Sequence, residues 1–178
     1  YIPDGFQKAI SNNYQMMVKV AKEKEVNFID LNRYFRKIKD TVSYPLYSKY
    51  GIHWNDYGMA LALDTLMKYT EAVRKTDIAD FEIDTLEITN DLRHPDYDVA
   101  GAMNLLYTLP HGEMAYPKLR VPSGQAKEQP KILSIADSYY WNIFNTSVIQ
   151  NISEDHKFWY FGAYVYPDTY SDSLHTNQ

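Results

Sequence analysis

Apolar residues recur every three or four positions in several segments of the chain, and this spacing predicts amphipathic helices. The strongest pattern covers residues 55–75, where Asn55 or Asp56 can cap the first turn. Further helices are expected over residues 5–25, 31–39, 96–109 and 139–150. The buried face of the strongest helix is expected to comprise Ala60, Leu63, Leu66, Met67 and Val73.

Shorter apolar runs between turn residues predict β-strands at 26–31, 81–89, 131–136 and 157–166. The stretch 107–130 is rich in proline and glycine, which predicts an irregular excursion. Strands that alternate with helices favour an α/β fold in which a sheet is layered between helices. At 178 residues we expect a single domain. After Pro167 the sequence turns polar, so either the domain ends there or the chain stops before its natural C-terminus.

Composition narrows the classes of function. The net charge of −5 argues against a nucleic-acid partner, because phosphate binding needs clustered Lys and Arg. The absence of cysteine excludes disulfides, thiol nucleophiles and zinc–thiolate sites. No apolar run is long enough to span a membrane, and no signal peptide is visible in the chain. The 17 tyrosines suit surfaces that meet amphipathic ligands such as sugars, although packing between sheet and helices also explains them.

Two short stretches carry candidate chemistry. In "ILSIADSYYW", a predicted core strand ends at Asp137 and Ser138, and a predicted helix follows. A serine at such a turn can attack a carbonyl while N–H groups of the helix start stabilise the oxyanion. In "YSKYGIHWNDYG", His53 and Trp54 precede a predicted helix, and His53 could remove the proton of the serine. The structural alternatives are a helix-capping serine and a buried loop histidine.

These residues carry a family resemblance. "ADSYY" resembles the Gly-Asp-Ser nucleophile block of the SGNH hydrolases, and "GIHWNDYG" resembles the Asp-x-His-Trp block of their circularly permuted, alginate O-acetyltransferase-like branch. The histidine block precedes the serine block, as in that branch. The resemblance implies a three-layer α/β/α sandwich with a mostly parallel sheet. It also implies that Ser138 is the nucleophile and His53 the base, with Oγ within about 2.6–3.2 Å of a ring nitrogen.

The other residues of the two blocks receive supporting roles. Asp137 is expected to be structural, with its side chain bonded to nearby loop backbone. Trp54 is a candidate substrate contact, although packing of its own loop is the favoured role. Tyr139 is a second candidate substrate contact.

Two positions depart from the family pattern. Gly51 stands where the family has the aspartate that orients the histidine, and Ala136 stands where it has glycine. Asp56 and Asp30 are the two candidates for a replacement acid. If no acid has taken over, Gly51→Asp is expected to raise esterase activity.

The resemblance implies an exported bacterial protein, periplasmic or extracellular, that transfers or hydrolyses O-acetyl groups of a polysaccharide. Its expected partners are a polysaccharide or acetylated sugar and an acetyl-donor membrane protein. The mechanism needs no metal or organic cofactor. The alternative is a catalytically degenerate family member that binds a glycan or a protein, and Gly51 favours that alternative.

A separate stretch, "NDLRHPDYD", gathers acidic residues around one histidine. A metal site built from them would be rich in oxygen with one imidazole. Asp and Asn near a proline more often make turns and caps, which is the favoured interpretation. The residues concerned are Asp91, His94, Asp96 and Asp98.

Overall fold

The computed structural model describes residues 11–124 and 127–167. The chain divides into two compact units, Tyr1–Lys37 and Ile38–Gln178, and the second carries both motif blocks. Within the described part of the chain, no helix is both long and apolar enough to cross a membrane. The beginning of the helix predicted over 5–25 and the polar tail after Pro167 lie outside the described residues.

The first unit contains helix α1 (Asn13–Glu23) and most of helix α2 (Leu31–Ile38). Residues 26–30 form no regular structure, so the strand predicted there is wrong. Their last residue, Asp30, accepts hydrogen bonds from the Arg33 backbone N–H and the Tyr14 hydroxyl instead. The Asp30 side chain therefore binds the first turn of α2, and the apolar run before it pairs with no strand among the described residues.

Helix α3 (Asp56–Arg74) is the long helix of the second unit, and its start confirms the predicted cap. The Asn55 side chain accepts a hydrogen bond from the Gly58 backbone N–H, which satisfies one of the free donors at the first turn. Ala60, Leu63 and Met67 are buried as predicted. Leu66 and Val73 are exposed, so the prediction that they belong to the buried face is wrong.

A two-stranded antiparallel sheet joins β1 (Glu82–Thr89) to β2 (Met114–Arg120). Strand β1 confirms the prediction for 81–89, whereas β2 lies inside the stretch 107–130 that was expected to be irregular. Pro117 misled the prediction because proline interrupts most strands. In a two-stranded sheet both strands are edges, so the missing N–H of Pro117 costs little, and this residue lies opposite Leu86.

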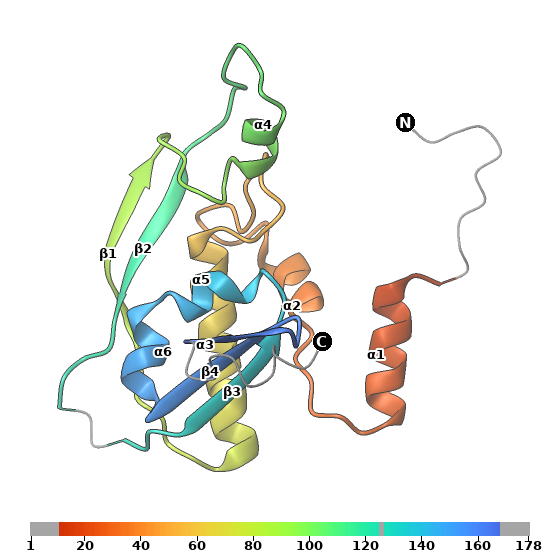
Figure 1. Ribbon diagram of the computed structural model, residues 1–178, viewed down its shortest axis with the longest axis vertical. Helices are drawn as coiled ribbons and strands as arrows, with labels where there is room; N and C mark the ends of the chain where they lie inside the picture. The colour runs from red at the N-terminus through yellow and green to blue at the C-terminus, as the bar shows by residue number, and fades with distance from the viewer. Residues whose placement is uncertain (1–10, 125–126, 168–178) are drawn as a thin grey trace, which may run out of the picture. The chain divides into compact units, whose positions relative to one another are not determined.

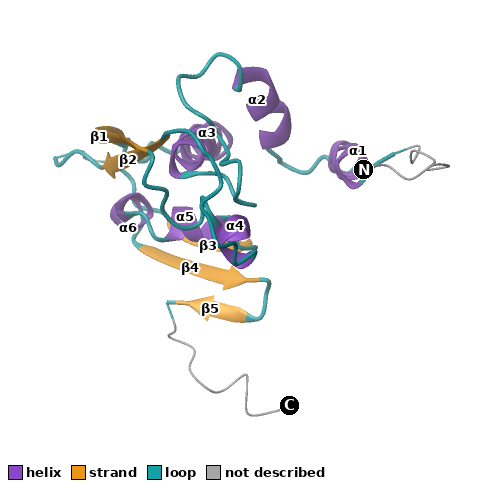
Figure 2. Cartoon of the chain, turned by 90° about the horizontal axis from the view of Figure 1, so that it is seen from above, coloured by secondary structure: helices purple, strands orange, loops and turns teal. Residues whose placement is uncertain are grey.

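The second sheet has the order β3–β4–β5, with β3 (Lys131–Ala136) parallel to β4 (Asp155–Tyr160). Strand β5 (Tyr164–Tyr166) returns antiparallel to β4 (Figure 2). The single strand predicted over 157–166 is therefore a hairpin. Its turn occurs at Phe161 and Gly162, both with positive φ, a conformation that glycine adopts without steric cost.

The described residues of the second unit also form three short helices: α4 (Asp98–Ala102), α5 (Tyr140–Phe144) and α6 (Ser147–Ile152). The helix predicted over 139–150 breaks near Thr146, whose hydroxyl donates to the Ile143 carbonyl. Helix α3 contacts β2 and α5, while α6 contacts β2 and β4 (Figure 1). The fold is thus mixed α/β, as expected, but its described sheets have two and three strands and are partly antiparallel.

Candidate active site

Ser138 lies in the turn directly after β3. Asp137 shapes this turn, because its carboxylate accepts a hydrogen bond from the Tyr139 backbone N–H at 3.0 Å and its carbonyl accepts one from Tyr140. The Ala136 carbonyl accepts a hydrogen bond from the Phe161 N–H, which holds the end of β3 against the turn after β4. The strand end thereby fixes the backbone on both sides of the serine.

Aromatic packing holds the helix that follows Ser138 against the sheet. The Trp141 ring contacts the rings of Phe158 and Tyr166 at centroid distances of 4.9 and 4.8 Å. Phe144, one turn later, packs on Phe158 as well. Aromatic pairs of this kind stabilise a fold beyond the area they bury. These aromatic side chains therefore pack against the buried Phe158, which favours the packing explanation for them.

His53 is held by the loop that leads into α3. The Asn55 side chain, fully buried, donates a hydrogen bond to the Pro45 carbonyl at 2.7 Å. The Tyr139 hydroxyl donates to the carbonyl of Ile52, the residue before His53. The imidazole also packs against the Tyr139 ring, at 4.9 Å between centroids. Residues next to the serine therefore fix the position of the histidine.

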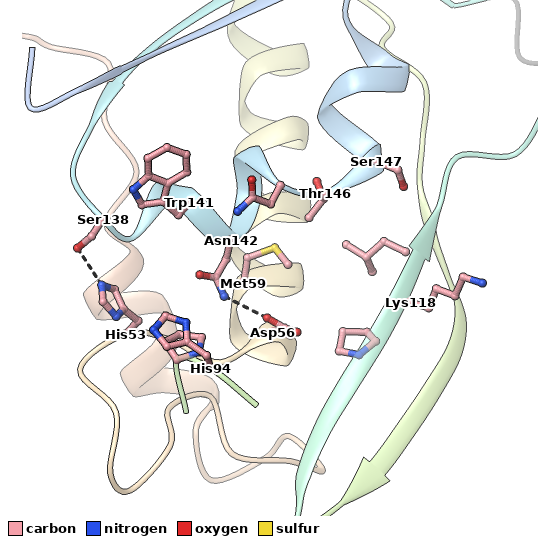
Figure 3. Close-up of a pocket in the computed structure, with 14 residues that line it drawn as sticks. His53, Asp56, Met59, His94, Lys118, Ser138, Trp141, Asn142, Thr146 and Ser147 are labelled. Atoms are coloured by element: carbon pink, nitrogen blue, oxygen red, sulfur yellow. Dashed lines mark hydrogen bonds between the residues drawn. The ribbon is translucent and has the colours of Figure 1, made fainter. Parts of the chain in front are cut away.

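The two motif blocks meet at one point. His53 Nε2 lies 2.8 Å from Ser138 Oγ, inside the interval expected for a nucleophile and its base (Figure 3). The two residues are 85 positions apart in the chain, and both side chains are partly shielded from solvent. The geometry allows Nε2 to accept the hydroxyl proton when Nδ1 carries the ring hydrogen.

A third residue faces the other side of the imidazole. Asp98 Oδ2 lies 3.6 Å from His53 Nδ1, within ion-pair range but longer than a hydrogen bond. The sequence singled out Asp98 as part of an acidic cluster and gave it no role toward His53. Nothing in the sequence around Asp98 identifies it as a neighbour of His53. The two residues lie 45 positions apart, and a backbone hydrogen bond between their segments brings them together. That contact runs from the Val99 N–H to the Tyr50 carbonyl at 3.0 Å.

The two acids proposed from the sequence have other partners. Asp56 accepts a hydrogen bond from the Asn142 side chain at 3.0 Å, and burial raises the pKa of this carboxyl (Figure 3). The hydrogen bonds of Asp30, to Tyr14 and Arg33, lie within its own unit.

Gly51 lies where two segments approach each other closely. A Cβ atom at this position would lie 2.6 Å from the Pro95 carbonyl oxygen and 2.5 Å from Ser48 Oγ. A side chain therefore does not fit without movement of the backbone. The expectation that Gly51→Asp would supply the orienting acid is inconsistent with this crowding.

The Ser138–His53 pair opens into a cleft of about 640 Å³. Polar and aromatic side chains from α5 line it, including Trp141 and Asn142, and Lys118 lines it from β2 (Figure 3). The two residues expected to contact substrate are not among its lining residues. Trp54 is buried and packs edge-on against Tyr139, so the described structure gives Trp54 a packing position.

The remaining members of the 90–98 cluster are dispersed. Asp96 is buried and accepts a hydrogen bond from the Tyr116 hydroxyl at 2.8 Å, whereas His94 and Asp91 are exposed. Burial is the main cause that raises the pKa of Tyr116 to about 12. Among the described residues, no group of three or more acidic or histidine side chains is arranged to hold a metal ion.

No family model, curated protein or solved structure matches the chain. The comparisons therefore add neither a family nor a function to the geometry of the site.

Proposed function

We propose that this protein is a serine-dependent acyl-transfer enzyme, related to the SGNH hydrolases, that transfers or hydrolyses O-acetyl groups of an extracytoplasmic polysaccharide. The observation that supports the proposal most is the 2.8 Å contact between Ser138 Oγ and His53 Nε2 at the end of a parallel strand. The carboxyl end of such a strand is the usual place for active sites in α/β sheets. The cleft beside the pair offers room for a sugar ester.

In the proposed reaction, Ser138 Oγ attacks the acetyl carbonyl as His53 Nε2 takes the hydroxyl proton. The bond between the acetyl carbon and the donor atom then breaks, and His53 returns the proton to the departing group of the acetyl donor, which is a sugar oxygen when the substrate is an acetylated sugar. The acetyl group is left on Ser138. Water or a sugar hydroxyl of the acceptor attacks this acetyl-serine, again with His53 as base. The bond between the acetyl carbon and Ser138 Oγ breaks, and His53 returns the proton to Oγ, which restores the free serine. The acceptor that reaches the intermediate decides between hydrolysis and transfer, and neither route requires a metal.

The proposal extends to the fold of the protein and to the compartment in which it acts. The two described sheets would belong to an SGNH-like three-layer sandwich with a mostly parallel sheet. The protein would act in the periplasm or outside the cell, with a polysaccharide as acceptor. A membrane protein would be the acetyl donor when the reaction is transfer.

The test is acetate release from a small aryl acetate. We expect wild-type turnover, loss of turnover in Ser138→Ala, and full turnover in the control Ser123→Ala, which alters an exposed serine in a turn that does not line the cleft. Equal turnover in wild type and Ser138→Ala would overturn the proposal. Absence of wild-type turnover, together with saturable binding of a polysaccharide, would instead support the degenerate binding module.

A further inference from the structure

We propose that Asp98 is the positioning residue for His53 and that it replaces the acid absent at position 51. This inference rests on the proposed function. Its first support is the place of Asp98 Oδ2, 3.6 Å from the ring nitrogen that faces away from Ser138. The His53 and Asp98 side chains are only 13% and 21% exposed, so solvent screens their attraction less than on an open surface.

The backbone explains how a residue so far along the chain reaches the site. The Tyr50 carbonyl accepts hydrogen bonds from the N–H groups of Val99 and Ala100, at 3.0 and 3.4 Å. The first turn of α4 is thereby attached to the histidine loop three residues before His53. Asp98 Oδ1 accepts the Val99 N–H at 2.7 Å, which leaves Oδ2 as the oxygen that faces the imidazole.

Gly51 is the second support. The segment that precedes Asp98 passes so close to Gly51 that a Cβ atom would lie 2.6 Å from the Pro95 carbonyl oxygen. A glycine is needed for this approach, and the approach brings Asp98 to His53. Gly51 and Asp98 are therefore two parts of one arrangement: the position that holds the acid in the resembled family provides clearance here.

The carboxylate would act through the histidine. By accepting the Nδ1 hydrogen, Asp98 favours the tautomer whose Nε2 lone pair faces Ser138. It also stabilises the positive charge that appears on the ring after proton transfer. Hydrogen bonds of this kind are often long without ligand and shorten as the reaction proceeds, which accommodates the 3.6 Å separation.

The kinetic test compares Asp98→Asn with Asp91→Asn. Asparagine retains the oxygen that accepts the Val99 N–H, so the substitution removes charge and leaves the helix start intact. We expect Asp98→Asn to lower kcat for an aryl acetate by about 10²- to 10⁴-fold with little change in KM. Asp91→Asn, an exposed acid of the same segment, should retain wild-type turnover. A kcat for Asp98→Asn within a factor of three of wild type would overturn the inference while Ser138-dependent turnover sustained the proposed function.

A second readout does not need turnover. Nitrogen NMR of labelled protein distinguishes the two neutral tautomers of His53. We expect the Nδ1–H form in the wild type and a mixture in Asp98→Asn, with unchanged chemical shifts elsewhere showing an intact fold. The same tautomer population in both proteins would overturn the inference. If turnover is absent but the tautomer shifts, the proposed function fails and the contact between Asp98 and His53 stands.

Discussion

Gly51→Ala tests whether close approach of two segments builds the site. The added Cβ would meet Ser48 Oγ at 2.5 Å and the Pro95 carbonyl oxygen at 2.6 Å. The serine hydroxyl can rotate away, but the carbonyl belongs to the backbone and must retreat with its segment. An ordinary contact begins near 3.4 Å, so this segment has to move by about 0.8 Å.

The size of the effect follows from this movement. Forcing one methyl group into a packed site costs about 1–3 kcal/mol, and a backbone neighbour that can move only with its whole segment places Gly51→Ala in the upper half of that range. For a chain of this length, a loss of about 2–3 kcal/mol lowers Tm by roughly 4–12 °C. A displacement of nearly 1 Å between Asp98 and His53 should also lower kcat by up to about 100-fold.

The matched control is Gly101→Ala, because a Cβ at Gly101 would meet no atom within 4 Å. In helix α4 this change should raise stability by up to about 1 kcal/mol, since alanine has the better helix propensity. Thermal unfolding followed by circular dichroism and turnover of an aryl acetate give the two readouts. Equal Tm and kcat for Gly51→Ala and Gly101→Ala would refute the role assigned to Gly51.

Three further predictions concern the supports of the site. His156 in β4 lies with Nε2 3.0 Å from the Tyr140 hydroxyl of α5. Burial lowers the pKa of His156, so the folded state disfavours its proton and the free energy of unfolding should decline as pH falls below about 6.5. His156→Gln should flatten this decline in urea unfolding, and an unchanged pH dependence would contradict the assignment. Asn55→Ala removes the α3 cap and the bond to Pro45, and should cost about 1–3 kcal/mol in the same assay; an unchanged midpoint would contradict that. Tyr139→Phe removes the hydrogen bond to the Ile52 carbonyl and should lower kcat while Tm stays close to that of the wild type. A lower Tm with unchanged kcat would show that the hydroxyl has a purely structural role.

The sequence predicted those parts of the site that depend on local pattern. Ser138 follows a strand and His53 precedes a capped helix, and both contexts are visible in a short window of residues. Asp98 could not be recognised, because its role depends on Tyr50 binding the start of a helix with only five residues. Gly51 was interpreted as a missing acid, since a pattern of residue types does not reveal how closely another backbone passes.

The fold was predictable to a similar extent. Long periodic segments such as α3 were found, whereas elements decided by tertiary pairing were not. Pro117 concealed β2, which only its pairing with β1 reveals, and residues 26–30 have strand-like residues but pair with no strand in the described part of the chain. The turn at Phe161–Gly162 divides one apolar run into two strands, a change that depends on positive φ at both residues.

Trapping the covalent intermediate tests whether Ser138 is the nucleophile that accepts the acetyl group. The protein is mixed with an aryl acetate, quenched in acid within the first turnover, digested, and examined by mass spectrometry. We expect one added acetyl group on the peptide that contains Ser138, and fragmentation should locate it on the serine oxygen. The same label should be absent from Ser138→Ala and reduced in His53→Ala. Turnover with the acetyl group on any other residue, or with an equal label in Ser138→Ala, would show that Ser138 is not the nucleophile.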